Sequence, residues 1–146
     1  MKILVSACLL GLNCRYCGGG ALDTEILKLN ENNCIIPVCP EQLGGLSVPR
    51  PPCEIKDGRV MGKDGTDKTY EFRKGAQETL QLAKMLGCTH AVLKERSPSC
   101  GSKIIYDGTF SGQKIPGAGV TAGLLAENGI KVLSEEDKEE LLHLIG

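Results

Sequence analysis

Short apolar runs alternate with longer, mainly polar segments along the whole chain. Four of these runs are rich in Ile, Leu and Val and have the length of buried strands. Pro37 weakens the prediction for the second run, because proline cannot donate a hydrogen bond to a strand ladder. The predicted strands cover residues 3–7, 35–39, 91–94 and 130–133.

The segments between these runs predict helices. The clearest helix covers residues 69–86, where Phe72, Ala76 and Leu80 recur at helical spacing. Gly87 follows them and can end the helix. Three further helices are predicted: residues 25–32 after a cap at Asp23 or Thr24, residues 120–127, and a last helix through residue 144 that starts from Ser134 and Asp137.

Turn residues mark the remaining segments. Residues 104–110 predict a small hairpin, with Asp107 and Gly108 in a type I′ turn. Residues 44–52 are dense in Gly and Pro and predict a loop, and residues 56–67 predict a mobile segment or a second hairpin.

The order of these elements defines the fold class. Strands and helices alternate four times, which indicates a parallel sheet with crossover helices. No linker or internal repeat divides the chain. The sequence therefore predicts one α/β domain over residues 1–146, with a Rossmann-like open, mostly parallel sheet, flanking helices and a small β-hairpin.

Composition narrows the function classes. The net charge is −1, Trp is absent and aromatic residues are few, so neither a nucleic-acid partner nor an anionic membrane is indicated. Residues 5–8 (VSAC) resemble a lipoprotein cleavage box, but the segment before them is too short for a signal core. No apolar stretch approaches the roughly 20 residues of a membrane span. We therefore expect a cytoplasmic protein with no membrane partner.

Eight cysteines are the unusual feature of the composition. In a reducing compartment, cysteine clusters indicate metal binding or catalysis. Cys8 ends the first predicted strand, Cys39 ends the second, and Cys100 lies in the loop after the third. Ligands of open α/β sheets gather outside the carboxyl ends of the strands, so we expect these three side chains to converge. Thiolate ligands favour an iron–sulfur cluster, zinc or copper(I).

The remaining cysteines leave alternatives open. A structural zinc site is one of them, although the chain lacks the second CxxC pair that such sites often use. A thioredoxin-like redox pair is another, but a Gly-rich run follows its CxxC where a helix should start. Cys88 and Cys34 lie near strand starts, where core packing is expected. The zinc ligands would be Cys14, Cys17, Cys34 and Cys39, and the redox pair would be Cys14 and Cys17.

Seven stretches carry a family resemblance, and they occur in the family's order over nearly the whole chain. They are SACLLG (6–11), RYCGG (15–19), VCPEQLGGL (38–46), PRPP (49–52), LKERSPSCG (93–101), IYDGTFSG (105–112) and GAGVTAGLL (117–125). With these stretches the chain resembles the TudS-like thiouracil desulfurase family.

The resemblance implies a cofactor and a reaction. The family binds a 4Fe–4S cluster through three cysteines, which match Cys8, Cys39 and Cys100, and the fourth iron has no protein ligand. That open iron would bind the sulfur of a small thiolated nucleobase or nucleotide, while water supplies the oxygen without net redox change. The implied substrates are 2-thiouracil, 4-thiouracil or 4-thiouridine monophosphate. Cluster-assembly machinery is the implied protein partner.

The resemblance also implies two catalytic residues, which match Glu41 and Ser97. Glu41 lies two residues after a cysteine ligand, and as a carboxylate it can activate water and later return a proton. Ser97 can donate a hydrogen bond to the substrate or relay a proton.

Candidate substrate-binding residues complete the predicted site. Arg50 is held in a Pro-rich frame, and arginine binds phosphate or carbonyl groups in a fork. Ser99 and Lys103 lie near the third cysteine ligand. Backbone N–H groups at residues 102–103 and at the helix start over residues 117–119 can bind an anion. His90 and His143 have no convincing context, and we assign them no role.

Three thiols depart from the family pattern. Cys14, Cys17 and Cys53 stand where the family often has an aliphatic residue, Asp and Ala, so they inherit no role. A different class of function also stays open, namely a cluster-binding or zinc-binding protein that senses sulfide or redox state without turnover. Glu41 separates the two classes, because a sensor needs no carboxylate.

Overall fold

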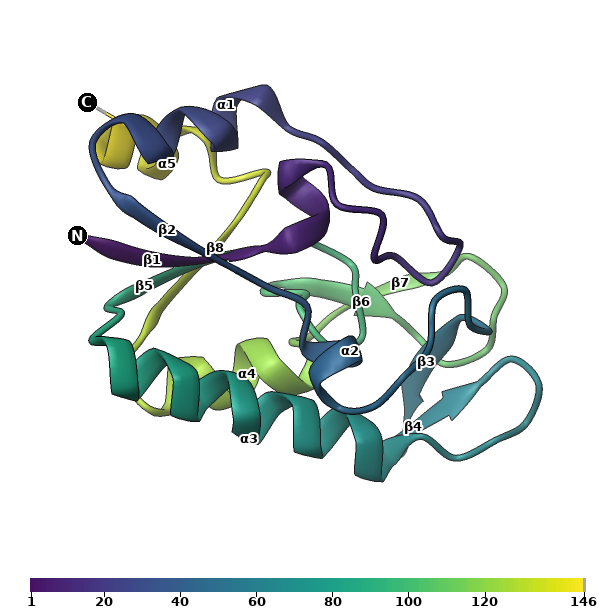
Figure 1. The fold of residues 1–146 in the computed structure, drawn as a ribbon. Coiled ribbons are helices and arrows are strands. Elements are labelled where there is room, and N and C mark those ends of the chain that lie inside the picture. The colour runs from purple at the N-terminus through teal and green to yellow at the C-terminus, as the bar shows by residue number, and fades with distance from the viewer. Residues whose placement is uncertain (146) are drawn as a thin grey trace.

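The centre of the fold is a sheet of four parallel strands, seen in a computed structural model that describes residues 1–145 (Figure 1). All four predicted strands are present, each displaced by one residue from its predicted bounds. They are β1 (Lys2–Ser6), β2 (Cys34–Val38), β5 (His90–Leu93) and β8 (Lys131–Ser134), arranged in the order β2-β1-β5-β8. The predicted α/β fold with a parallel sheet is therefore confirmed.

The position of β2 explains how the sheet accommodates a proline. Pro37 lies opposite Val5 of β1. Since β2 is at the edge of the sheet, no strand lies on its other side to require the missing N–H group.

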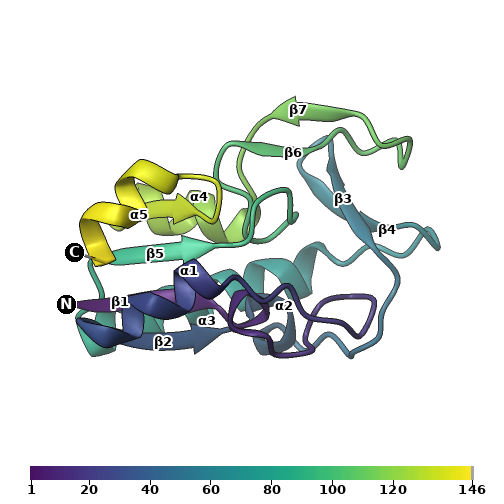
Figure 2. The same cartoon turned by 90° about the horizontal axis from the view of Figure 1, so that it is seen from above.

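Helices cover both faces of the sheet (Figures 1 and 2). α3 (Thr69–Leu86) has the predicted bounds and ends where Gly87 adopts a left-handed conformation. With α4 (Val120–Glu127) it covers one face, and α1 (Thr24–Leu27) and α5 (Lys138–Ile145) cover the other. No helix in residues 1–145 is both long and apolar enough to cross a membrane.

The ends of the shorter helices follow from side-chain caps. The carboxylate of Asp23 accepts the N–H groups of Glu25 and Ile26, as predicted, and a 3₁₀ turn over Lys28–Glu31 continues α1. α5 begins later than predicted, at Lys138. The carboxylate of Asp137 accepts the N–H of Ser134, and this capping turn precedes the helix.

Alternating side chains of the strands fill two cores. Ile3 and Val5 of β1 pack on the α1 and α5 side, and Leu4 packs on the α3 and α4 side. All three are fully buried. This alternation is what a strand covered on both faces requires.

Two hairpins lie beyond the carboxyl ends of the sheet strands (Figure 2). The first, β3 (Cys53–Lys56) with β4 (Arg59–Gly62), is the hairpin predicted for this region. The second pairs β6 (Ile104–Tyr106) with β7 (Lys114–Pro116), so the predicted pairing of β6 with residues 109–110 is wrong. The carboxylate of Glu54 in β3 accepts the N–H groups of Gly108 and Phe110 at 3.0 and 3.1 Å. These bonds hold the segment as a wider loop.

A close contact between two helices fixes the chain that follows β2. α2 (Pro40–Leu43) packs on α3 with backbone almost touching backbone. A Cβ atom on Gly75 would lie 1.9 Å from the carbonyl oxygen of Pro40, and one on Gly44 would lie 2.0 Å from that of Glu71. Only glycine fits at either position, so α2 is pressed onto α3.

Candidate active site

A cavity of about 420 Å³ lies at the carboxyl ends of β1, β2 and β5, between the sheet and the two hairpins. The segments that follow these three strands form most of its wall, and residues of β3 and of the β6–β7 loop complete it. Five of the eight cysteines line it, namely Cys8, Cys14, Cys39, Cys53 and Cys100. The structure thus brings together the three cysteines that the strand order placed at this edge.

Each of these three cysteines is held by local structure. Cys8 lies in the 3₁₀ turn Ala7–Leu10 that follows β1, and its carbonyl accepts the N–H groups of Gly11 and Ala21. Cys39 is the N-cap residue of α2. Cys100 donates its N–H to the hydroxyl of Ser97 at 3.0 Å. The backbone at each position is therefore fixed independently of any bound group.

The donor set of the cavity suits a cluster rather than a single ion. No three His, Cys, Asp or Glu side chains among residues 1–145 are arranged to hold one metal ion. In an iron–sulfur cluster, each cysteine binds a different iron atom, so its ligands are spread around a larger group. Thiols from three separate loops around a cavity of this size meet that requirement.

The four-cysteine zinc site is contradicted by the strand geometry. Cys34 starts β2 and Cys39 follows its end, roughly 13 Å or more apart at the rise of a β-strand. Cys34 is exposed, so the prediction that it packs in the core is wrong, whereas Cys88 is buried as predicted. The redox pair is not supported either, because Cys14 is buried, Cys17 is exposed and turns follow them.

Burial raises the pKa of several of the cavity thiols above the usual range for cysteine. It raises the pKa of Cys8 to about 11, although the nearby Lys94 and Arg15 oppose the shift. It raises the pKa of Cys100 to about 12 against a hydrogen bond with Ser6. A bound metal deprotonates a coordinating thiol, so loading of this site would release protons.

A buried ion pair forms the wall opposite these thiols. The Nε atom of Arg50 lies 3.1 Å from Oε1 of Glu41, and the two side chains are only 5% and 17% exposed. Burial raises the pKa of the Glu41 carboxyl above its usual range, while Arg50 and a hydrogen bond from Ser97 offset part of that shift. The guanidinium also donates to the carbonyl oxygens of Ser47 and Cys14, each at 3.0 Å. Arg50 is thus a cavity residue whose partners lie within the protein.

Ser97 connects the carboxyl wall to the loop of the third cysteine. Its hydroxyl oxygen accepts the N–H groups of Ser99 and Cys100 at 3.1 and 3.0 Å. Its hydrogen bond to Glu41 lowers the pKa of that carboxyl. The two predicted catalytic residues therefore touch each other, although the distance between them in the sequence gave no sign of it.

Sequence reasoning missed a second buried carboxyl group, Glu95. Its carboxylate accepts the N–H groups of Ser102 and Lys103 at 2.7 and 3.2 Å and the hydroxyl of Ser102 at 3.0 Å. Burial alone would raise the pKa of Glu95, but these donors outweigh it and hold the pKa below its usual range. The N–H groups predicted to bind a substrate anion are therefore occupied by the protein's own carboxylate.

The other predicted anion site is also filled from within. At the start of α4, the N–H groups of Gly119 and Val120 donate to the carbonyl oxygens of Gly101 and Pro98. A Cβ atom on Gly119 would lie 2.5 Å from the backbone of Ser99. This glycine permits close packing of the helix on the loop and leaves no room for a ligand.

Two predicted substrate-binding residues lie outside the cavity. The hydroxyl of Ser99 is buried and pairs with that of Thr121 at 2.8 Å. The side chain of Lys103 is 66% exposed and forms an ion pair with Asp137. The loop after β5 turns both away from the cavity, so the structure does not bring these two residues to the predicted site. Arg50 is the one residue of the three that lines the cavity.

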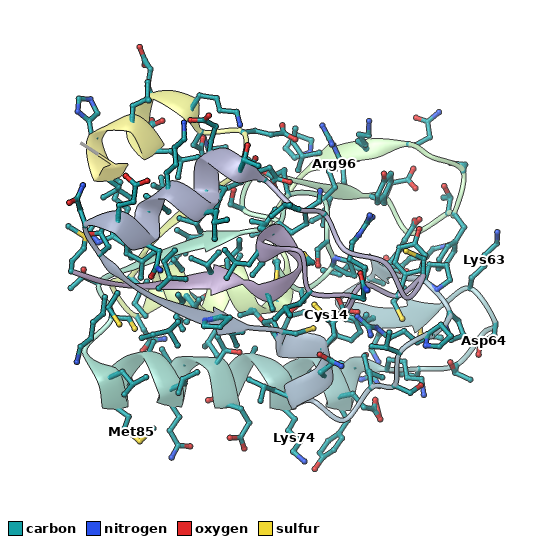
Figure 3. The ribbon with its side chains drawn as sticks, turned by 45° about the horizontal axis from the view of Figure 1, so that its top comes forward. Cys14, Lys63, Asp64, Lys74, Met85 and Arg96 are labelled. Atoms are coloured by element: carbon teal, nitrogen blue, oxygen red, sulfur yellow. The ribbon has the colours of Figure 1, made fainter. Side chains whose placement is uncertain are left out.

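Cys14 lies inside the molecule, whereas Lys63 and Asp64, which follow β4, lie at its edge (Figure 3). The Cys39 thiol donates to the Cys14 carbonyl oxygen at 3.8 Å, and the Cys14 thiol lies close to that of Cys39. Burial, with Cys39 and Cys8 close by, raises the pKa of Cys14 to about 12. An extra thiol thus touches one of the three convergent cysteines.

Comparisons with known proteins match nearly the whole chain. A family model described as 2-thiouracil desulfurase covers residues 3–137. The uncharacterized protein YbbK of Bacillus subtilis (strain 168) is 45% identical over 150 residues, which are 96% of this chain and 99% of that protein. A solved structure described as the 4Fe–4S-dependent thiouracil desulfidase TudS has a TM-score of 0.92 and 43% identity. That match covers 97% of this chain and 95% of the other, so it includes the segments that line the cavity.

Proposed function

The chain belongs to the 2-thiouracil desulfurase family, and from this we propose that it replaces the sulfur of a thiouracil with oxygen from water and releases sulfide. The observation that carries the proposal is the arrangement of the cavity. Three thiols from three loops line one cavity together with a largely buried carboxyl group, Glu41. The solved relative of 43% identity, described as a 4Fe–4S-dependent thiouracil desulfidase, supports the same reaction.

Cys8, Cys39 and Cys100 are the proposed ligands of a 4Fe–4S cluster with one iron left open. Their support is chemical: thiolates are the ligands that iron–sulfur clusters use, and these three come from separate loops around one cavity. When bound, the cluster supplies a soft Lewis acid for the thiocarbonyl sulfur. The substrates proposed are 2-thiouracil, 4-thiouracil and 4-thiouridine monophosphate.

Glu41 is the proposed proton-transfer group. Exchange of sulfur for oxygen consumes one water and releases hydrogen sulfide, so protons move although no electrons do. Arg50 binds Oε1 of Glu41, and we assign the proton exchange to Oε2. A carboxyl group whose pKa is raised by burial is a stronger base than an exposed one, so it can take a proton from water and return it in the same cycle.

Ser97 and Arg50 are proposed to hold that carboxyl group in place. The Ser97 hydroxyl contacts Glu41 and is fixed by the backbone of the Cys100 loop, so it can pass a proton or donate to the substrate. Arg50 is nearly fully buried and ties Glu41 to the carbonyl of Cys14. A sensor without turnover has no use for such a group, which favours the enzyme.

We place this reaction in the cytoplasm, with cluster-assembly machinery as the source of iron and sulfide. The support is the state of the thiols, because all eight cysteines are free. Free thiols beside a labile cluster suit a reducing compartment.

The direct test is anaerobic loading of the full chain with iron and sulfide, followed by incubation with 2-thiouracil. We expect uracil and sulfide to appear in equal amounts, and the two other thiolated compounds test the substrate range. Replacement of any proposed ligand by alanine should abolish iron binding. Cys88→Ala is the matched control, because Cys88 is as buried as Cys8 but lies outside the cavity. A colourless protein with one tight zinc ion, or a loaded protein that converts no thiolated base, would refute the proposal.

A further inference from the structure

The contact between Cys14 and Cys39 has no part in the proposed reaction. The Cys39 thiol donates a hydrogen bond to the Cys14 carbonyl oxygen at 3.8 Å, and the Cys14 thiol lies close to that of Cys39. Cys14 is 7% exposed and Cys39 is half-buried, and both line the cavity. Two reduced cysteines, 25 positions apart in the sequence, are thus held in mutual contact.

Rigid neighbours hold both residues. The carbonyl oxygen of Cys14 accepts an N–H from the buried guanidinium of Arg50. Cys39 caps α2, which Gly44 and Gly75 fix against α3. The contact therefore belongs to the folded chain and does not depend on a bound group.

We propose that Cys14 and Cys39 form a disulfide bond when an oxidant destroys the cluster, and that this bond preserves Cys39 as a ligand for reloading. The inference rests on the proposed ligand role of Cys39. It gives a function to Cys14, a thiol that stands where the family pattern often has an aliphatic residue.

The chemistry needs a peroxide as the oxidant and proceeds in two balanced steps. Once iron is lost, the more exposed Cys39 thiol reacts with hydrogen peroxide to give a sulfenic acid and water. The Cys14 sulfur then attacks the Cys39 sulfur, which forms the disulfide and expels a second water. A dithiol reductant reverses the product. Without a neighbouring thiol, further peroxide carries the sulfenic acid to the sulfinic acid, which such reductants do not restore.

The neighbours of the other cavity cysteines single out this pair. Cys53 donates to the carbonyl oxygen of Pro51, and Cys100 is hydrogen bonded to Ser6. Cys8 lies near both members of the pair, but like Cys53 and Cys100 it has no thiol hydrogen-bond partner among the described residues. Cys53 is therefore a suitable control, since it lines the same cavity without touching Cys39.

The test starts from the cluster-loaded full chain. Hydrogen peroxide is added until the cluster absorbance is lost, and the cysteines are mapped by mass spectrometry of peptides under non-reducing conditions. We expect a Cys14–Cys39 disulfide as the main product. Dithiothreitol followed by anaerobic iron and sulfide should then restore nearly the original iron content.

Variants at Cys14 test whether this residue protects Cys39 from irreversible oxidation or only lies near it. In Cys14→Ser and Cys14→Ala chains, the same treatment should leave sulfinic acid at Cys39 and abolish most iron reloading. Cys53→Ala should behave as wild type. A different disulfide partner for Cys39, or full iron recovery in both Cys14 variants, would overturn the proposal. The disulfide is identified in the wild-type chain, so this result does not depend on whether a variant folds. Iron content is measured without thiouracil turnover. A negative result therefore refutes the disulfide proposal without refuting the proposed desulfurase function.

Discussion

The segments that follow β2 and β5 each place a carboxyl group at the same end of the sheet, yet in opposite electrostatic states. After β2, Glu41 has one guanidinium and one hydroxyl as partners, and burial raises its pKa. After β5, Glu95 receives several backbone N–H groups and a hydroxyl, and its pKa is lowered. Both side chains line the cavity.

The difference teaches how one chemical group serves two purposes. Glu95 is surrounded by donors that stabilise its charge, so it stays ionised and organises the loop that carries Cys100. Glu41 has too few donors to offset its burial, so it can exchange a proton. The number of N–H donors around each carboxylate, rather than its burial, separates the structural group from the reactive one.

Glu41→Gln should give the largest effect on turnover. Glutamine keeps the shape and can still accept the Arg50 N–H, but it cannot exchange a proton. We expect the desulfuration rate to fall by about 10²–10⁴-fold, with iron content unchanged. Initial rates of sulfide release, normalised to bound iron, check this. Iron loss in proportion to activity would instead make Glu41 a structural group like Glu95.

Glu95→Gln should mainly lower the stability of the folded protein, rather than directly lower the rate of the proposed reaction. It removes a charge that Ser102 and Lys103 solvate, and buried donors are left poorly paired. We expect a loss of about 2–3 kcal/mol in the free energy of unfolding, together with weaker iron retention because Cys100 lies on this loop. Urea titration of the full chain measures the first effect. The exposed Glu139→Gln is the control.

In the wild-type protein, low pH should remove the contribution of the ionised Glu95 carboxylate to the free energy of unfolding. The folded-state pKa of Glu95 lies below its unfolded value, so its stabilisation is present above the unfolded pKa of about 4.3 and disappears as pH falls through the folded pKa. The difference in unfolding free energy between wild type and Glu95→Gln should be constant near pH 7 and shrink below about pH 4. A difference that grows in acid would contradict this assignment.

Gly75→Ala should displace the segment that follows β2 by a steric clash. The added methyl group would overlap the carbonyl oxygen of Pro40 and push α2, with Cys39 and Glu41, away from α3. We expect a destabilisation of about 1–3 kcal/mol and reduced iron content, measured by thermal unfolding and iron assay. Gly123→Ala in α4 is the matched control, because its nearest neighbour would be 4.0 Å away. Equal effects of the two changes would rule out the contact.

Lys103→Ala should have the smallest effect. Its side chain is two-thirds exposed and pairs with Asp137 away from the cavity, and exposed ion pairs contribute about 0–1 kcal/mol. We expect an unchanged KM for thiouracil and nearly unchanged stability. A several-fold rise in KM would restore Lys103 as a substrate-binding residue.

The parts of the fold that depend on local pattern were predictable. α3 has its predicted bounds because its apolar spacing and Gly87 act within the helix itself. The convergence of Cys8, Cys39 and Cys100 followed from strand order alone, since parallel strands end at one edge. The α/β fold and the family are likewise confirmed.

The parts that depend on which segments meet in space were not predictable. The wider β6–β7 loop exists because Glu54, on another hairpin, captures its N–H groups. The pairing of Arg50 with Glu41 and the internal role of Glu95 are tertiary contacts without a sequence signature. Lys103 and Ser99 lie outside the cavity because nearness in sequence to Cys100 does not fix the direction of a side chain.

The separation of the three proposed ligand cysteines along the chain sets an order of events during synthesis. Cys8 and Cys39 leave the ribosome long before Cys100, and β5, which leads to Cys100, pairs directly with β1. A nascent chain therefore has no complete binding site until most of the sheet has formed. If these cysteines hold the proposed cluster, its insertion follows formation of most of the sheet, and the receiving form is a largely folded, metal-free chain.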